Sequence, residues 1–189
     1  MRASAYAGVV VAAVLVACSD APSPPEQPLP ARPEVPDDWR IVTTDEEDVV
    51  LAIPRELIAT GTTGAIVAVE EDEGGVGRRE VWVIGPGTLE LRPRQTTDEW
   101  VEASMWLTGQ QEGAVLGAVS RDPVALPAGP AIEMTASYTV DGRESWTILY
   151  VIDTSPGFAV FRAGGAGPPP DGLPDEIALI RDLATFPTP

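Results

Sequence analysis

Several amino-acid types are missing or scarce in this chain: it has no histidine, lysine or asparagine, and a single cysteine. Without histidine, no Ser-His-Asp or Cys-His nucleophile pair can form, and no imidazole can ligate a metal. Without lysine, the chain has no Schiff-base nucleophile and no lysine-dependent phosphate loop. Composition alone therefore excludes most of the common routes to catalysis.

Positive charge is also scarce, since 12 basic residues against 29 acidic ones give a formal net charge of −17. Such a surface repels phosphate backbones and anionic head groups, so we expect no nucleic-acid partner. An acidic, proline-rich composition can indicate disorder. However, 44% apolar residues indicate that most of this chain folds around a core.

The N-terminal region carries the longest apolar stretch, from Ala3 to Ala17, after a short start that bears Arg2. A charged start, an apolar run and a small-residue cleavage site are typical of a secretory signal. About 15 apolar residues are too few to cross a bilayer core, which needs about 20. An ordinary secretory signal followed by an incidental cysteine remains the alternative interpretation.

The end of this stretch, Leu15-Val16-Ala17-Cys18, resembles the lipobox of bacterial lipoproteins. The resemblance implies that the thiol of Cys18 carries diacylglycerol, with acyl chains such as palmitate. It also implies that a signal peptidase cuts between Ala17 and Cys18. Lipidation would explain an unpaired cysteine in an exported protein. Because two or three acyl chains anchor stably, we expect a lipid-anchored protein on the extracytoplasmic face of the cell membrane.

The chain divides into a signal peptide at 1–17, a lipidated cysteine with a proline-rich linker at 18–38, and one domain at 39–189. Seven of the twenty residues in 19–38 are proline, which predicts a disordered, extended tether. In polyproline II form, at about 3.1 Å per residue, it would reach roughly 60 Å. The remaining residues suffice for one domain with a single core.

Alternating and β-branched patterns predict most of the domain to be antiparallel strands. The expected strands are 39–42, 49–53, 64–69, 80–84, 114–119, 132–140, 146–152 and 158–161, with a short one at Leu89 and Leu91. Arg55 to Ala59 is expected to form a helical turn, and the glycine- and proline-rich 164–172 a loop. A capping-box pattern and helical spacing predict a helix from Thr97 to Gln110, and a last helix begins near Pro174. Together these predict an α+β fold, an antiparallel sheet flanked by helices.

The element order is similar to that of the LpqN-type actinobacterial lipoproteins and the wider PsbP-like sandwich. The similarity rests on "VVLAIPREL", "TTDEWVEASMWL", "PVALPAGPAIEMTASYTVDG" and a last helix ending "LATF", and covers roughly residues 39–186. It implies an antiparallel sheet with helices on both faces, in a binding or assembly module. It brings no shared catalytic positions.

A run of acids, Glu70, Glu71, Asp72 and Glu73, could gather a hard cation such as calcium. Its spacing does not match an EF-hand loop, and adjacent acids at a strand end point to opposite faces. A solvated hairpin tip is the simpler interpretation, so we expect no metal or other cofactor. A carboxylate pair for glycan hydrolysis is available in any chain this acidic, but nothing singles out two of these residues.

Five tryptophans outnumber the three phenylalanines. Trp39, Trp82 and Trp146 fall on expected strands and are interpreted as core. Trp100 and Trp106 lie six residues apart on the expected helix and need not share a face, so one of them is a candidate contact for a partner. We expect a membrane-anchored, non-catalytic binding or assembly module for an envelope protein, glycan or lipid. The alternative is a carboxylate-dependent hydrolase of cell-wall glycans.

Overall fold

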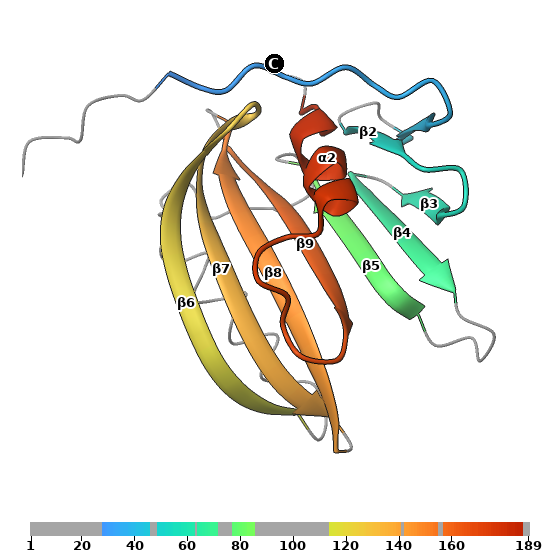
Figure 1. Ribbon diagram of the computed structural model, residues 1–189. Coiled ribbons are helices and arrows are strands. Elements are labelled where there is room, and N and C mark those ends of the chain that lie inside the picture. The colour runs from blue at the N-terminus through green and yellow to red at the C-terminus, as the bar shows by residue number, and fades with distance from the viewer. Residues whose placement is uncertain are drawn as a thin grey trace, which may run out of the picture.

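The computed structural model describes residues 28–45, 49–62, 64–71, 77–85, 114–140, 142–154 and 157–186 of the chain. Within these residues, seven strands form one antiparallel sheet in the order β3-β4-β5-β9-β8-β7-β6, and β1 and β2 form a separate pair (Figure 1). The elements are β1 (Arg40–Thr43), β2 (Val50–Ile53), β3 (Ile58–Thr62), β4 (Ala65–Glu71), β5 (Gly77–Ile84), β6 (Ala114–Leu126), β7 (Gly129–Val140), β8 (Arg143–Asp153), β9 (Phe158–Ala166) and α2 (Asp175–Leu183).

The expected α+β class, a helix-flanked PsbP-like sandwich, is wrong. Across the described ranges the chain is mostly strand, and its helix content is the nine residues of α2. Several strands run beyond their expected ends: β6 continues to Leu126, β7 begins at Gly129 and β9 continues to Ala166. The described residues therefore form a large antiparallel sheet with a short helix on it and a separate pair of strands.

The loop expected at 164–172 begins as part of β9 instead, because glycine there meets close neighbours on both sides. Gly164 pairs with Glu80 on β5 and with Thr147 on β8. A Cβ atom at residue 164 would lie 3.2 Å from the carbonyl oxygen of Trp146 and 3.3 Å from Oε1 of Glu80. Glycine inside a strand often marks such close approach, whereas glycine-rich composition by itself indicates a turn.

The helical turn expected at 55–59 is shorter than predicted, because its last two residues belong to a strand. The amide of Leu57 donates to the carbonyl of Pro54 at 3.3 Å, which closes one turn. Ile58 and Ala59 then pair with Val69 and Ala68 in the β3–β4 hairpin.

Other local expectations are confirmed. The strand pair around 39–42 and 49–53 is β1–β2, the hairpin after 64 is β4–β5, and the meander is β7–β8–β9. The last helix follows Pro174 with Asp175 and Glu176 in its first turn, where acids favour the helix dipole. The helix expected from Thr97 to Gln110 and the strand at Leu89 and Leu91 lie outside the described residues.

The core lies on both faces of the sheet, and α2 covers one of them. Ile177 and Ile180 of α2 are fully buried in a cluster with Val81 and Val83 of β5. Leu149 of β8 belongs to a second cluster, on the opposite face, with neighbours from β7 and β9. From Trp146 to Ile152, β8 is buried throughout, which confirms a central strand covered on each side.

The small β1–β2 pair and the start of the described chain both attach to the C-terminal segment. Val50 of β2 and Thr185 exchange two backbone hydrogen bonds, of 3.0 and 2.9 Å. Residues 28–39 form no helix or strand and run in extended form past α2 and β2 (Figure 1). The Arg32 guanidinium donates to the Thr185 hydroxyl at 3.0 Å and to the Ala184 carbonyl at 3.4 Å. This segment therefore lies against the domain.

Candidate functional site

The residues that the sequence singled out are largely beyond the described ranges. Ala17 and Cys18, the acids Asp72 and Glu73, and the tryptophans Trp100 and Trp106 all lie outside them. Glu71 is the last residue of β4, and Glu70 is described with its side chain. No helix in the described part of the chain combines the length and the apolar character needed to cross a bilayer.

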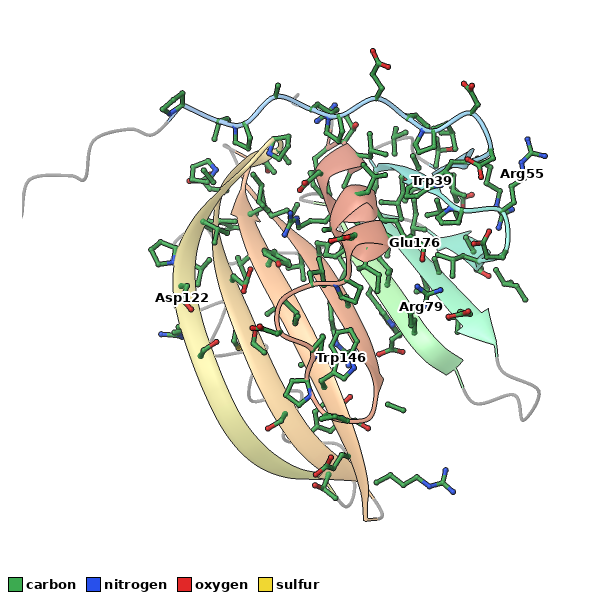
Figure 2. The ribbon with its side chains drawn as sticks, viewed as in Figure 1. Trp39, Arg55, Arg79, Asp122, Trp146 and Glu176 are labelled. Atoms are coloured by element: carbon green, nitrogen blue, oxygen red, sulfur yellow. The ribbon has the colours of Figure 1, made fainter. Side chains whose placement is uncertain are left out.

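Glu70, the member of the candidate cation site whose side chain is described, forms an ion pair with Arg79. Arg79, opposite it on β5, donates from Nε to Oε2 of Glu70 at 2.5 Å and from Nη1 to Oε2 of Glu176 at 2.6 Å. The hydrogen bond to Glu70 is the largest cause that raises the pKa of Arg79. Figure 2 shows Arg79 and Glu176 turned toward each other between β5 and α2. The described residues contain no group of three or more carboxylate, thiol or imidazole side chains able to hold a metal ion.

Of the three tryptophans interpreted as core, one is exposed. Trp39 is half-buried and packs against the core, and Trp146 is 6% exposed. Trp82, by contrast, is 38% exposed on β5. Its neighbours Val81 and Val83 are buried with α2, so the alternation of a strand directs Trp82 to the opposite face.

Trp82 lies in a row of side chains that crosses the sheet. It pairs with Val67 on β4 and with Arg162 on β9, and directly paired residues of antiparallel strands share a face. In the next row, Glu80 of β5 pairs with Val69 of β4. We call the exposed part of this face, formed by Ile58, Val67, Glu80, Trp82 and Arg162, the Trp82 surface.

Arg162 is fixed beside the indole ring by two side chains. Its Nη2 lies 3.2 Å from Oε1 of Glu80, and its Nε donates to the hydroxyl of Thr147 at 3.0 Å. Thr147 is buried on β8, and its own hydroxyl donates to the carbonyl of Ala163 at 3.2 Å. The guanidinium carbon of Arg162 lies 5.9 Å from the ring centre of Trp82, within the range of a cation–π contact.

Apolar side chains adjoin the ring on the strands toward the sheet edge. Ile58 of β3 is 57% exposed, Val67 and Val69 of β4 are half-buried, and Thr60 of β3 is exposed. The Trp82 surface thus combines an aromatic plane, aliphatic neighbours and one mutually neutralised ion pair. These groups suit binding, since the carboxylate of Glu80 is already paired with the guanidinium of Arg162.

A second polar cluster lies on the α2 face and is built into the packing. Nη1 of Arg181 donates to the hydroxyl of Tyr150 at 2.9 Å, and its Nε donates to Oδ1 of Asp182 at 2.7 Å. Burial raises the pKa of Tyr150, and a hydrogen bond to Glu133 raises it further, whereas the charge of Arg181 lowers it. Tyr150 is 1% exposed, so the phenol is buried where this cluster joins α2 to the sheet.

Comparisons with known proteins add little to the description of this surface. No protein-family model matches the chain, and no curated protein matches it. A crystal structure from Bacteroides thetaiotaomicron is similar at a TM-score of 0.47 and 9% sequence identity. The alignment covers 80% of this chain and 49% of the other, so this chain spans about half the length of that protein.

Proposed function

We propose that this chain is a non-catalytic lipoprotein of a bacterial cell envelope, tethered to the membrane through Cys18, that binds another envelope component through the Trp82 surface. The observation that carries the proposal is the exposed indole of Trp82, with the Arg162–Glu80 ion pair beside it. Support for the tether comes from the Leu15-Val16-Ala17-Cys18 sequence.

The exposed ring has enough area to contribute to binding. A tryptophan side chain presents up to about 250 Å², so 38% exposure leaves somewhat under 100 Å² of mostly apolar surface. Covering that area would contribute about 2 kcal/mol at about 25 cal/mol per Å². Tryptophan and arginine are also the residue types that most often dominate binding energy at interfaces.

The alternative, a carboxylate-dependent glycan hydrolase, needs two carboxylates that face one substrate. Glu70 and Glu176 come together on either side of Arg79, and Glu80 pairs with Arg162. Each of these carboxylates thus already has a guanidinium partner. For these three carboxylates, the pairing favours the binding proposal over hydrolysis.

The test is crosslinking in intact cells with wild-type chain and the Trp82→Ala variant. Amine-reactive reagents would miss a chain without lysine, so carboxylate-directed or photoactivated reagents are required. The proposal expects one set of envelope components to co-purify with the wild type and to be reduced at least about fivefold with Trp82→Ala. Equal recovery with both would contradict it, as would turnover of wall polymers that depends on a single acid.

The tether is tested separately by mass spectrometry of the mature chain. We expect acyl chains on an N-terminal Cys18, and a misprocessed form in the Cys18→Ala variant. An unmodified thiol at residue 18 would refute the lipid anchor and leave the binding proposal in place.

A further inference from the structure

The Trp82 surface is locally neutral although the chain is strongly acidic. Glu80 and Arg162 lie 3.2 Å apart and cancel each other's charge, while the chain carries −17. An anionic ligand would be repelled by the whole chain and would meet no net positive charge among the described side chains of this surface. A cationic ligand would find the Glu80 carboxylate already paired. The charges therefore favour an uncharged ligand.

The Trp82 surface presents both a hydrogen-bond donor and a hydrogen-bond acceptor, and both are held in place. The carboxylate of Glu80 accepts and the guanidinium of Arg162 donates, and both side chains remain partly exposed, at 35% and 20%. The buried hydroxyl of Thr147 fixes the guanidinium from below. A ligand with groups that both donate and accept, such as hydroxyls, matches this pair without any rearrangement.

The exposed apolar area of the Trp82 surface is small compared with a protein–protein interface. Among the residues that the structure describes, Trp82 and Ile58 are the large apolar side chains of this face that are more than a third exposed, and the indole offers roughly 100 Å². A stable protein–protein interface buries about 800 Å² on each partner. The exposed apolar area therefore matches one or a few rings of a small ligand better than a folded protein partner.

We propose that the Trp82 surface binds a neutral oligosaccharide, with one sugar ring lying on the indole of Trp82 and its hydroxyls bonding to Glu80 and Arg162. One face of a sugar ring presents C–H groups, which are attracted to the negative face of an aromatic ring. Its rim presents hydroxyls, which suit the carboxylate and the guanidinium. The inference names the ligand class for the proposed binding function and rests on that function.

The test is calorimetric titration of the acylated full-length chain in detergent micelles. The probes are the tetramers of N-acetylglucosamine, mannose and β-1,4-linked glucose, with a galacturonate tetramer as the anionic comparison. We expect at least one neutral tetramer to bind with a dissociation constant below about 1 mM, and the galacturonate tetramer to bind at least about tenfold more weakly. Trp82→Ala should raise the dissociation constant of the neutral tetramer by about tenfold or more.

Two further variants separate recognition from folding. Trp82→Phe keeps an aromatic face and should retain binding within about fivefold. Ile41→Ala removes an exposed apolar side chain on β1 and should leave the affinity unchanged. Circular dichroism of each variant shows whether the sheet is intact.

Three results would overturn the inference: no binding of any neutral tetramer, equal affinity of wild type and a folded Trp82→Ala variant, or tighter binding of galacturonate. If the neutral tetramers fail but Trp82-dependent crosslinking in cells succeeds, the ligand class is wrong and the binding function stands. If a tetramer binds and is also cleaved, the non-catalytic function is wrong and glycan recognition stands.

Discussion

At the scale of single residues, arginines connect the elements of this fold. Arg79 joins β4, β5 and the start of α2, Arg162 joins β5, β8 and β9, and Arg181 joins α2 to β8. The planar guanidinium suits this role because it donates in several fixed directions at once. The acidic excess of the chain supplies the acceptors.

Removing the guanidinium of Arg79 should destabilise the domain. Arg79→Ala leaves Glu70 and Glu176 near each other without a cation, and we expect a loss of about 1–2 kcal/mol in the free energy of unfolding, reduced by partial exposure of the site. Urea denaturation measures it. Arg143→Ala, at an exposed position at the start of β8, is the matched control and should change stability by no more than about 0.5 kcal/mol. Equal effects of the two substitutions would contradict the connecting role of Arg79.

Tyr150 should make stability fall at alkaline pH. Because burial raises its pKa above the ordinary value, the unfolded chain releases the phenolic proton from about pH 10 while the native chain keeps it. The native state then binds more protons, so the contribution is present in full below about pH 10 and is lost as pH rises above it. Urea unfolding between pH 8 and 11 should show a steeper decline in the wild type than in Tyr150→Phe. Parallel declines would show that Tyr150 has no such role.

At the scale of elements, the strands with one clear apolar alternation were predictable, whereas those that depend on a neighbour were not. The pattern around Met134 and Ala136 identified β7, and the apolar run through Tyr150 identified β8. The continuation of β9 past Gly164 depends on how closely Trp146 and Glu80 approach it, which local composition does not contain.

The exposure of Trp82 likewise could not be predicted from the sequence pattern. Trp82 stands between two valines, and all three residues are apolar, so the pattern does not say which face of β5 is covered. The position of α2 decides it, because α2 buries Val81 and Val83. The tryptophans that the sequence favoured as contacts, Trp100 and Trp106, lie outside the described residues, so that hypothesis stays a prediction.

Two glycines in hairpin turns should differ sharply in their tolerance of alanine. Both have positive φ, +152° at Gly129 and +75° at Gly142. At Gly129 an added Cβ would overlap the carbonyl oxygen of Asp153, whereas at Gly142 nothing lies within 4 Å. We expect Gly142→Ala to cost about 1 kcal/mol from backbone strain alone. Gly129→Ala should cost at least about 1 kcal/mol more, as measured by urea unfolding. Similar costs would contradict the close packing of the β6–β7 turn.

At the scale of the whole molecule, the segment before β1 would determine how far the domain stands from the lipid anchor proposed at Cys18. If residues 28–38 stay on the domain, as the contacts of Arg32 with Thr185 and Ala184 indicate, the proposed tether after Cys18 shortens from the 20 residues of 19–38 to the nine of 19–27. Its extended reach then falls from roughly 60 Å to roughly 30 Å. The domain would remain close to the membrane surface.

Removing the guanidinium of Arg32 should release residues 28–38 from the domain. Each hydrogen bond contributes about 1 kcal/mol, so Arg32→Ala should speed cleavage after Glu34 by a glutamate-specific protease by about fivefold or more. Arg143→Ala serves as the control and should leave that rate unchanged. Cleavage of the wild type after Glu34 as fast as in an unstructured peptide would show that the segment is not held.

The central claim, that the Trp82 surface is the binding surface, is tested most directly by site-specific photocrosslinking in intact cells. A photoreactive amino acid at Thr60, exposed in the same row as Val67 and Trp82, reports on this face. One at Asp122, exposed on β6 in the row of Tyr150 on the α2 face (Figure 2), reports on the other. The account predicts crosslinked envelope material at position 60, abolished by Trp82→Ala, and little at position 122. Crosslinks at 122 and none at 60 would contradict it.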